Sequence, residues 1–245
     1  HYSDEETDYP VQFQLWEPVE LEKVEAGLRA SGVQLKTSKA ALKETEPNKW
    51  RSYVLGVWQR QQKQHKELRK LYDSKLALAQ KMLTHWVRNH PDAHLPVTFD
   101  SWFTQPEFCK FLDRELKLAY VGTLSGKDPL TLKTGLLPVE KFAERLKQEH
   151  LAAIAHSHPP VFQRIRIPFK GEHEIYYSYC NIHRLHNFGR QRLVINFRQA
   201  DLSDNPTFYI SNRLSWRAPG ITRIRRHCWS VEVFHEEGKA EGLDQ

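Results

Sequence analysis

Asp100 is the first residue whose position suggests chemistry. It follows directly on a short apolar segment, residues 95–99, which has the length and composition of a β-strand. A carboxylate in this position lies at the carboxyl edge of a sheet, where α/β proteins usually build their sites. The alternative is structural, because an aspartate that opens the segment Ser-Trp-Phe also suits a turn or a helix cap. The sequence leaves both interpretations open.

Glu232 is the second candidate. If the segment 218–241 is a helix, Arg225, Cys228, Glu232 and Lys239 follow one another at intervals of three, four and seven residues and share one face. Two carboxylates with basic residues nearby suit Mg²⁺ (or Mn²⁺), because hard divalent cations prefer oxygen ligands and leave positions open for phosphate oxygens. The alternative is an ordinary charged helix face in solvent.

A third constellation is weaker. Cys180, His183 and His186 form a C-x-x-H-x-x-H motif within a segment that reads as a strand. Residues three apart on a strand face opposite sides of the sheet, so we do not expect them to share a zinc ion. The sequence contains no glycine-rich phosphate loop and no G-x-S-x-G nucleophile elbow.

The elements that must position the two carboxylates follow from hydrophobic periodicity. Residues 11–15 alternate apolar and polar side chains, which predicts a strand that forms the second arm of a hairpin after an acidic turn. Residues 20–44 are weakly helical. Residues 49–89 are strongly helical, and a break would fall at Gly56 or at residues 72–74. The strand 95–99 is followed by a helix over 105–116, a strand over 118–125 and a helix over 138–150.

The second half of the chain has a different pattern. Four segments separated by turn residues predict an antiparallel β unit, over residues 162–169, 173–185, 190–199 and 206–216. We therefore predict an α/β fold with three parts: a partial core over 1–150, an antiparallel β region over 151–215, and the helix carrying Glu232 over 216–245.

Composition limits the class of protein. The chain has 245 residues, of which 27% are charged and 11% aromatic, as in a globular protein. No apolar run reaches the length of about 18 residues that a membrane helix needs. Three cysteines without framework spacing favour a reduced, cytoplasmic compartment. A net charge of +6 and the basic runs at 59–70 and 213–227 suggest a polyanionic partner.

Several segments together resemble the DDE insertion-sequence transposases whose catalytic glutamate lies in a Tyr-x2-Arg-x3-Glu-x6-Lys signature. The segment "WSVEVFHEEGKAEGLDQ" is similar to the second half of that signature, and "PVTFDSWF" to the strand that bears the second catalytic aspartate. The segment "RLVINFRQADLSDNPTFYISNRLSW" resembles the β insertion of this family and the strand returning to the catalytic helix. The segment "DYPVQFQLWEP" resembles its third core strand.

This resemblance implies an RNase H-like core that cuts and joins double-stranded DNA, at transposon ends and target, with two magnesium ions. Asp100 and Glu232 would be catalytic metal ligands, and Lys239 would contact a DNA phosphate. Cys228 stands at the arginine position of the signature and Arg225 at its tyrosine position. The chain therefore lacks the guanidinium that would bind a phosphate in bidentate fashion, and Arg225 and Arg226 would replace it in part. The family also implies a bacterial, nucleoid-associated location.

The first catalytic aspartate of this family would precede residue 1. The sequence begins at His1 and Met82 is its single methionine, so we expect a piece of a longer protein that does not join DNA strands by itself and tends to self-associate through open strand edges. Two other hypotheses stay open. One is a basic DNA-binding or interaction fragment without chemistry, and the other is a metal-dependent nuclease on the same core.

Overall fold

The computed structural model describes residues 2–4, 7–9 and 19–228. Contacts divide the chain into two compact units, one formed by residues 13–83 and the other by residues 1–12 together with 84–245. Each unit is described by itself. Among the described residues, no helix combines the length and apolar character that crossing a membrane requires.

The unit of residues 13–83 is helical. Its core contains Val24 and Leu28 from the first helix and Trp50, Val54, Val57 and Trp58, whose spacing gives the third helix one apolar face. The Nε1 atom of Trp50 donates a hydrogen bond of 2.6 Å to the buried carboxylate of Glu25. The elements are α1 (Leu21–Ala30), η1 (Thr37–Lys39), α2 (Leu42–Thr45), α3 (Pro47–Gln61) and α4 (Lys66–Arg69). Helix α5 (Lys75–Asn89) crosses the boundary between the units.

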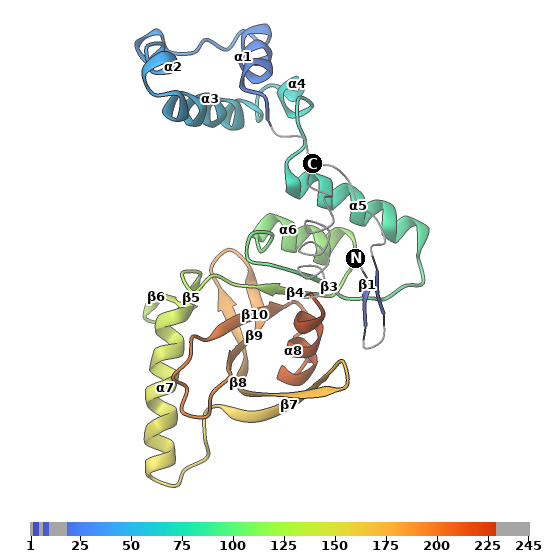
Figure 1. Ribbon diagram of the computed structural model, residues 1–245, viewed down its shortest axis with the longest axis vertical. Coiled ribbons are helices and arrows are strands. Elements are labelled where there is room, and N and C mark those ends of the chain that lie inside the picture. Colours follow the sequence, from blue (N-terminus) through green and yellow to red (C-terminus); the bar gives the residue numbers. More distant parts are fainter. Residues whose placement is uncertain (1, 5–6, 10–18, 229–245) are drawn as a thin grey trace. The chain divides into compact units, whose positions relative to one another are not determined.

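The other unit is built on one eight-stranded sheet (Figure 1). Its path runs β3-β4-β10-β9-β8-β5-β6, and β7 pairs with β8. Strands β3 and β4 are parallel and every other pairing in this sheet is antiparallel. The strands are β3 (Val97–Phe99), β4 (Tyr120–Thr123), β5 (Pro129–Leu132), β6 (Gly135–Pro138), β7 (Gln163–Phe169), β8 (Glu172–Leu185), β9 (Gly189–Phe197) and β10 (Thr207–Ser211).

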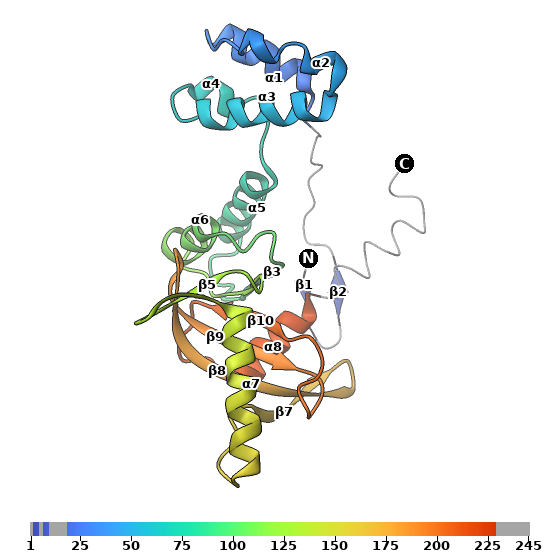
Figure 2. The same ribbon diagram turned by 90° about the vertical axis from the view of Figure 1, so that its left-hand side faces the viewer.

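Helices cover both faces of this sheet. On one face α8 (Ala218–His227) packs Ile221 against Val121 of β4 and Val194 of β9. On the other face α7 (Val139–Ala155) places Phe142 against Tyr179 of β8, and Figure 2 shows this helix lying across the strands. Helix α6 (Pro106–Lys110) continues into a π-helical turn, η2 (Phe111–Glu115), on the same face as α7.

The observed elements confirm a mixed α/β fold with parallel and antiparallel strands. The helix 105–116, the helix 138–150 and the four antiparallel strands are confirmed, with ends that differ from the prediction by up to five residues, as in α7 and β10. Helix α3 runs through Gly56 without a break, whereas the break at residues 72–74 is present. The hairpin β5–β6 was not predicted. A short hairpin joins β1 (Tyr2–Ser3) to β2 (Asp8–Tyr9), and the predicted strand 11–15 lies outside the described residues.

The three-part division of the chain stays a prediction. Strands β3 to β6 come from residues before 150 and strands β7 to β10 from residues after it, yet both groups belong to one sheet. The partial core and the β region predicted from the sequence are therefore continuous through hydrogen bonds between β4 and β10 and between β5 and β8.

Candidate active site

Asp100 lies at the end of β3, where the chain leaves the sheet. Its Oδ1 atom accepts hydrogen bonds from the backbone amides of Trp102 (3.0 Å) and Phe103 (3.2 Å), and its carbonyl accepts one from Thr104 Oγ1 (2.8 Å). The aspartate therefore does shape the turn, as the structural interpretation required. Its side chain is exposed, and Oδ2 makes no hydrogen bond within the described part of the chain. One oxygen holds the turn and the other is open to a cation.

Close packing fixes this turn on β4. Residue 122 is a glycine, and a Cβ atom there would lie 2.6 Å from Cε2 of Phe99 and 2.9 Å from Oγ1 of Thr104. Both distances are too short for real contacts, so the absence of a side chain at Gly122 lets β3 and the Asp100 turn approach. The position of Asp100 is thus set by buried packing as well as by the turn.

Arg225 reaches the same edge of the sheet. Phe99 pairs with Gly122, so Asp100 and Thr123 are each one residue further along the two parallel strands. The Nε atom of Arg225, in the last turn of α8, donates a hydrogen bond of 2.6 Å to Oγ1 of Thr123. Helix α8 also contacts both β3 and β4. The sequence from Ile221, which packs on Val121, to Arg225 therefore advances toward the carboxyl ends of the parallel strands.

Arg226 has different neighbours. Its Nε atom donates to both carboxylate oxygens of Glu174, at 3.0 and 2.9 Å, and its guanidinium lies 4.5 Å from the ring centre of Phe169. Glu174 also accepts a hydrogen bond of 2.7 Å from the Tyr176 hydroxyl and lies 3.6 Å from Arg198. Burial alone would raise the pKa of Glu174, but these donors and charges outweigh burial and lower its pKa. The charge of Arg226 is therefore partly neutralised by β8.

Two of the predicted site residues, Glu232 and Lys239, lie outside the described residues, so their approach to Asp100 stays a prediction. Within residues 2–4, 7–9 and 19–228, no three histidine, cysteine, aspartate or glutamate side chains form a metal-binding group. Asp100 fits a hard cation as a single exposed oxygen ligand, and a complete site needs further carboxylates.

Thr123 was not singled out from the sequence. A polar residue at the end of the second parallel strand, directly after three buried positions, is the signal that points to it. The motif of Cys180 and His183 behaves as predicted. Cys180 packs with the α8 side of the sheet, whereas His183 contacts Phe142 of α7 and hydrogen-bonds to Tyr179, so the two residues occupy opposite faces.

No protein-family model matches the sequence, and comparison with curated proteins finds no match either. The described residues define the class of fold as mixed α/β, with an aspartate and a helix-borne arginine at one edge of the sheet.

Proposed function

We propose that this chain belongs to a metal-dependent enzyme that cleaves and joins DNA strands, of the insertion-sequence transposase type, on an RNase H-like core. The observation that carries the proposal is the convergence of Asp100 and α8 at the carboxyl ends of β3 and β4, through the hydrogen bond from Arg225 to Thr123. Carboxyl ends of parallel strands are where α/β proteins commonly build sites. The helix that should carry Glu232 leads to that edge.

Each residue has a defined role in this proposal. Asp100 and Glu232 would hold Mg²⁺ or Mn²⁺ through carboxylate oxygens, and the amides of Trp102 and Phe103 orient Asp100 by donating hydrogen bonds to its Oδ1 atom. When bound, two such ions would supply Lewis-acid activation of the attacking oxygen and stabilisation of the leaving oxygen in phosphoryl transfer. Lys239 and Arg225 contact DNA phosphates near the metal ligands.

The structure supports Arg225 more strongly than Arg226 for contact with DNA at this edge. Arg225 is hydrogen-bonded to Thr123, a neutral residue, and makes no ion pair with a described residue. Arg226 is paired with Glu174, and removing it from that carboxylate to bind phosphate would cost an ion pair. We therefore assign Arg225 to direct contact with a DNA phosphate at the metal site. Arg226 contributes only to the positive electrostatic potential around that site.

Metal binding tests the proposal directly. Mn²⁺ bound to the purified chain is measured by electron paramagnetic resonance for the wild type, Asp100→Asn and Glu232→Gln. We expect each variant to bind Mn²⁺ about tenfold more weakly, because each loses a charged oxygen ligand. Asp92→Asn, at an exposed aspartate outside the sheet, is the matched control and should bind like the wild type. Unchanged binding in both site variants would sink the proposal.

Incubation with supercoiled plasmid and Mg²⁺ separates the remaining hypotheses. Strand joining indicates a transposase, cutting without joining indicates a nuclease, and DNA binding that is independent of metal indicates an interaction fragment. Two-metal catalysis needs carboxylates on both sides of the ion pair, and only Asp100 and Glu232 are assigned here. We therefore expect binding of DNA without joining. Joining that disappears in Glu232→Gln would show that this chain also supplies a third carboxylate.

A further inference from the structure

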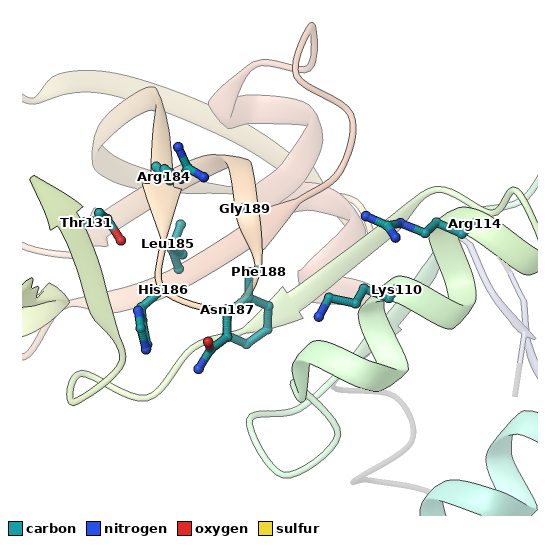
Figure 3. A pocket seen from close by; sticks show the side chains of 9 residues that line it. All are labelled: Lys110, Arg114, Thr131, Arg184, Leu185, His186, Asn187, Phe188 and Gly189. Carbon is teal, nitrogen blue, oxygen red and sulfur yellow. The ribbon is translucent and has the colours of Figure 1, made fainter.

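A second group of basic side chains surrounds an open pocket of about 450 Å³ on the sheet unit. Lys110 at the end of α6 and Arg114 in the π-helical turn both extend toward the hairpin that joins β8 to β9 (Figure 3). Arg184, near the end of β8, adds a third positive charge to the lining. The spacing of four residues between Lys110 and Arg114 is the one sign of this pair in the sequence.

No described residue neutralises the charges in this pocket by an ion pair. Lys110, Arg114 and Arg184 make no ion pair with any described residue, and no aspartate or glutamate lines the pocket. Asp113, on the same helical segment, accepts a hydrogen bond of 2.6 Å from Asn212 instead. Three like charges around one concavity repel one another, and an anion bound among them would relieve that repulsion.

Buried hydrogen bonds hold the two walls of the pocket together. The hydroxyl of Tyr120, on β4, donates a hydrogen bond of 3.0 Å to Oε1 of Gln191 and lies beside the thiol of Cys109, the neighbour of Lys110. Nε2 of Gln191 in turn donates to the carbonyl of Phe188 in the hairpin, at 3.2 Å. Tyr120 and Gln191 are both buried. The helix and the hairpin are therefore fixed relative to each other before any ligand binds.

The pocket lies at the edge of the sheet opposite Asp100. Arg192, near the start of β9, pairs with Ser211, and Ser211 pairs with Val121 near the start of β4. The hairpin before β9 is thus level with the amino end of β4, whereas Asp100 follows the carboxyl end of β3. A ligand in the pocket does not occupy the metal site.

We propose that Lys110, Arg114 and Arg184 form a binding site for a phosphodiester of double-stranded DNA, separate from the edge that carries Asp100. The choice of DNA as the source of the phosphate rests on the proposed function. Ammonium and guanidinium groups are the side chains that bind phosphate oxygens most strongly, and a duplex presents such groups at regular intervals. The site adds affinity without sequence readout, because it addresses the backbone alone.

The test measures binding of a fluorescein-labelled duplex of about 20 base pairs by anisotropy over a series of NaCl concentrations. The double variant Lys110→Ala/Arg184→Ala is compared with Lys141→Ala/Arg164→Ala, which removes the same charge from exposed positions on α7 and β7. We expect the pocket variant to bind about tenfold more weakly and its log–log salt slope to fall by about 1.8, two phosphates at 0.9 each. The control should keep the wild-type slope. Circular dichroism verifies that both variants fold.

Titration with inorganic phosphate, followed by NMR of the backbone amides of Asn187 and Gly189, reports the pocket alone. Shifts that saturate in the wild type and vanish in Lys110→Ala/Arg184→Ala, together with the loss of salt slope, support the proposal. Equal slopes in the two double variants would overturn it, and phosphate binding without an effect on the duplex would reassign the pocket to small phosphate compounds. Mn²⁺ binding at Asp100 is measured independently, so failure of the proposed function is recognised by that assay and not by this one.

Discussion

The Nε atom of Arg225 donates a hydrogen bond of 2.6 Å to Oγ1 of Thr123, across 102 residues of sequence. This contact ties the last turn of α8 to the carboxyl end of β4, one strand away from Asp100. The contact places the last turn of α8 at the edge of the sheet that carries Asp100.

Replacement of Thr123 by valine should loosen that connection. Valine keeps the shape of threonine but cannot accept the hydrogen bond, so the half-buried guanidinium of Arg225 loses its partner, and we expect the free energy of unfolding to fall by about 1–2 kcal/mol. Urea denaturation measures this loss. Thr207→Val, at an exposed position of β10, is the matched control and should change stability by less than about 0.5 kcal/mol. Equal effects of the two changes would contradict a structural role for the contact.

Two replacements at Asp100 should distinguish its structural role in the turn from its proposed role as a metal ligand. An asparagine side chain retains an Oδ1 acceptor for the amides of Trp102 and Phe103, so Asp100→Asn should keep the stability of the wild type while losing metal affinity. Asp100→Ala removes the acceptor and should destabilise the protein by about 0.5–2 kcal/mol. Thermal unfolding without metal compares the three proteins. A loss of stability in Asp100→Asn as large as in Asp100→Ala would show that the negative charge itself holds the turn.

Gly122→Ala should lower the free energy of unfolding. The added methyl would lie 2.6 Å from Phe99 and 2.9 Å from Thr104, and relieving such overlap in a packed core costs about 1–3 kcal/mol. Gly56→Ala is the informative counterpart, because its nearest atom would be 3.6 Å away and alanine favours a helix by about 0.5–1 kcal/mol. The denaturant midpoint should therefore fall in Gly122→Ala and rise in Gly56→Ala. A stable Gly122→Ala protein would mean that β3 does not approach β4 this closely.

The stability of the protein should decline as the pH falls below about 6.5, the ordinary pKa of histidine. Burial lowers the pKa of His150, whose Nδ1 accepts a hydrogen bond of 3.0 Å from the amide of Phe162, and burial likewise lowers the pKa of His183. Below the ordinary pKa the unfolded chain therefore binds more protons than the native chain. The native state loses stability from that pH down through the lowered native pKa.

His150→Gln should weaken this pH dependence, since glutamine carries no titrating group and can still accept the hydrogen bond from Phe162. Urea midpoints measured between pH 7.5 and pH 5 are expected to change less in His150→Gln than in the wild type, with His183 responsible for the remaining slope. His158→Gln, at an exposed histidine, should follow the wild-type curve. Parallel curves for all three proteins would exclude His150 as a source of the dependence.

The elements governed by local sequence were predictable. The strand before Asp100 is a short apolar run that ends in a turn residue. In β8 and β9 apolar and polar residues alternate, and the turn between these strands contains Asn187 and Gly189 with positive φ angles of 67° and 80°. The hairpin β5–β6 was missed because its strands are four residues each and begin or end with proline. Proline usually argues against a strand interior.

The hydrogen-bond partners of Arg225 and Arg226 could not be predicted from local sequence. Arg225 and Arg226 are adjacent, yet one meets Thr123 and the other Glu174, from two different strands. These contacts depend on the strand order of the sheet, which places β4 and β8 on either side of β10 and β9. The charge of Lys110 likewise acquires a role only when the hairpin before β9 is brought opposite α6.

The order of strands also dictates how the sheet must assemble. β10 is the one described strand that joins the pair β3–β4 to the group β5–β9, and it comes last in sequence among the described strands. β4 ends at Thr123 and β10 begins at Thr207, so the ribosome adds 84 residues (207 − 123) between them. At about 5–20 residues per second, β4 waits roughly 4–17 s for its antiparallel neighbour. During synthesis β4 therefore has no antiparallel partner for that time, and the sheet can close only after β10 has been made.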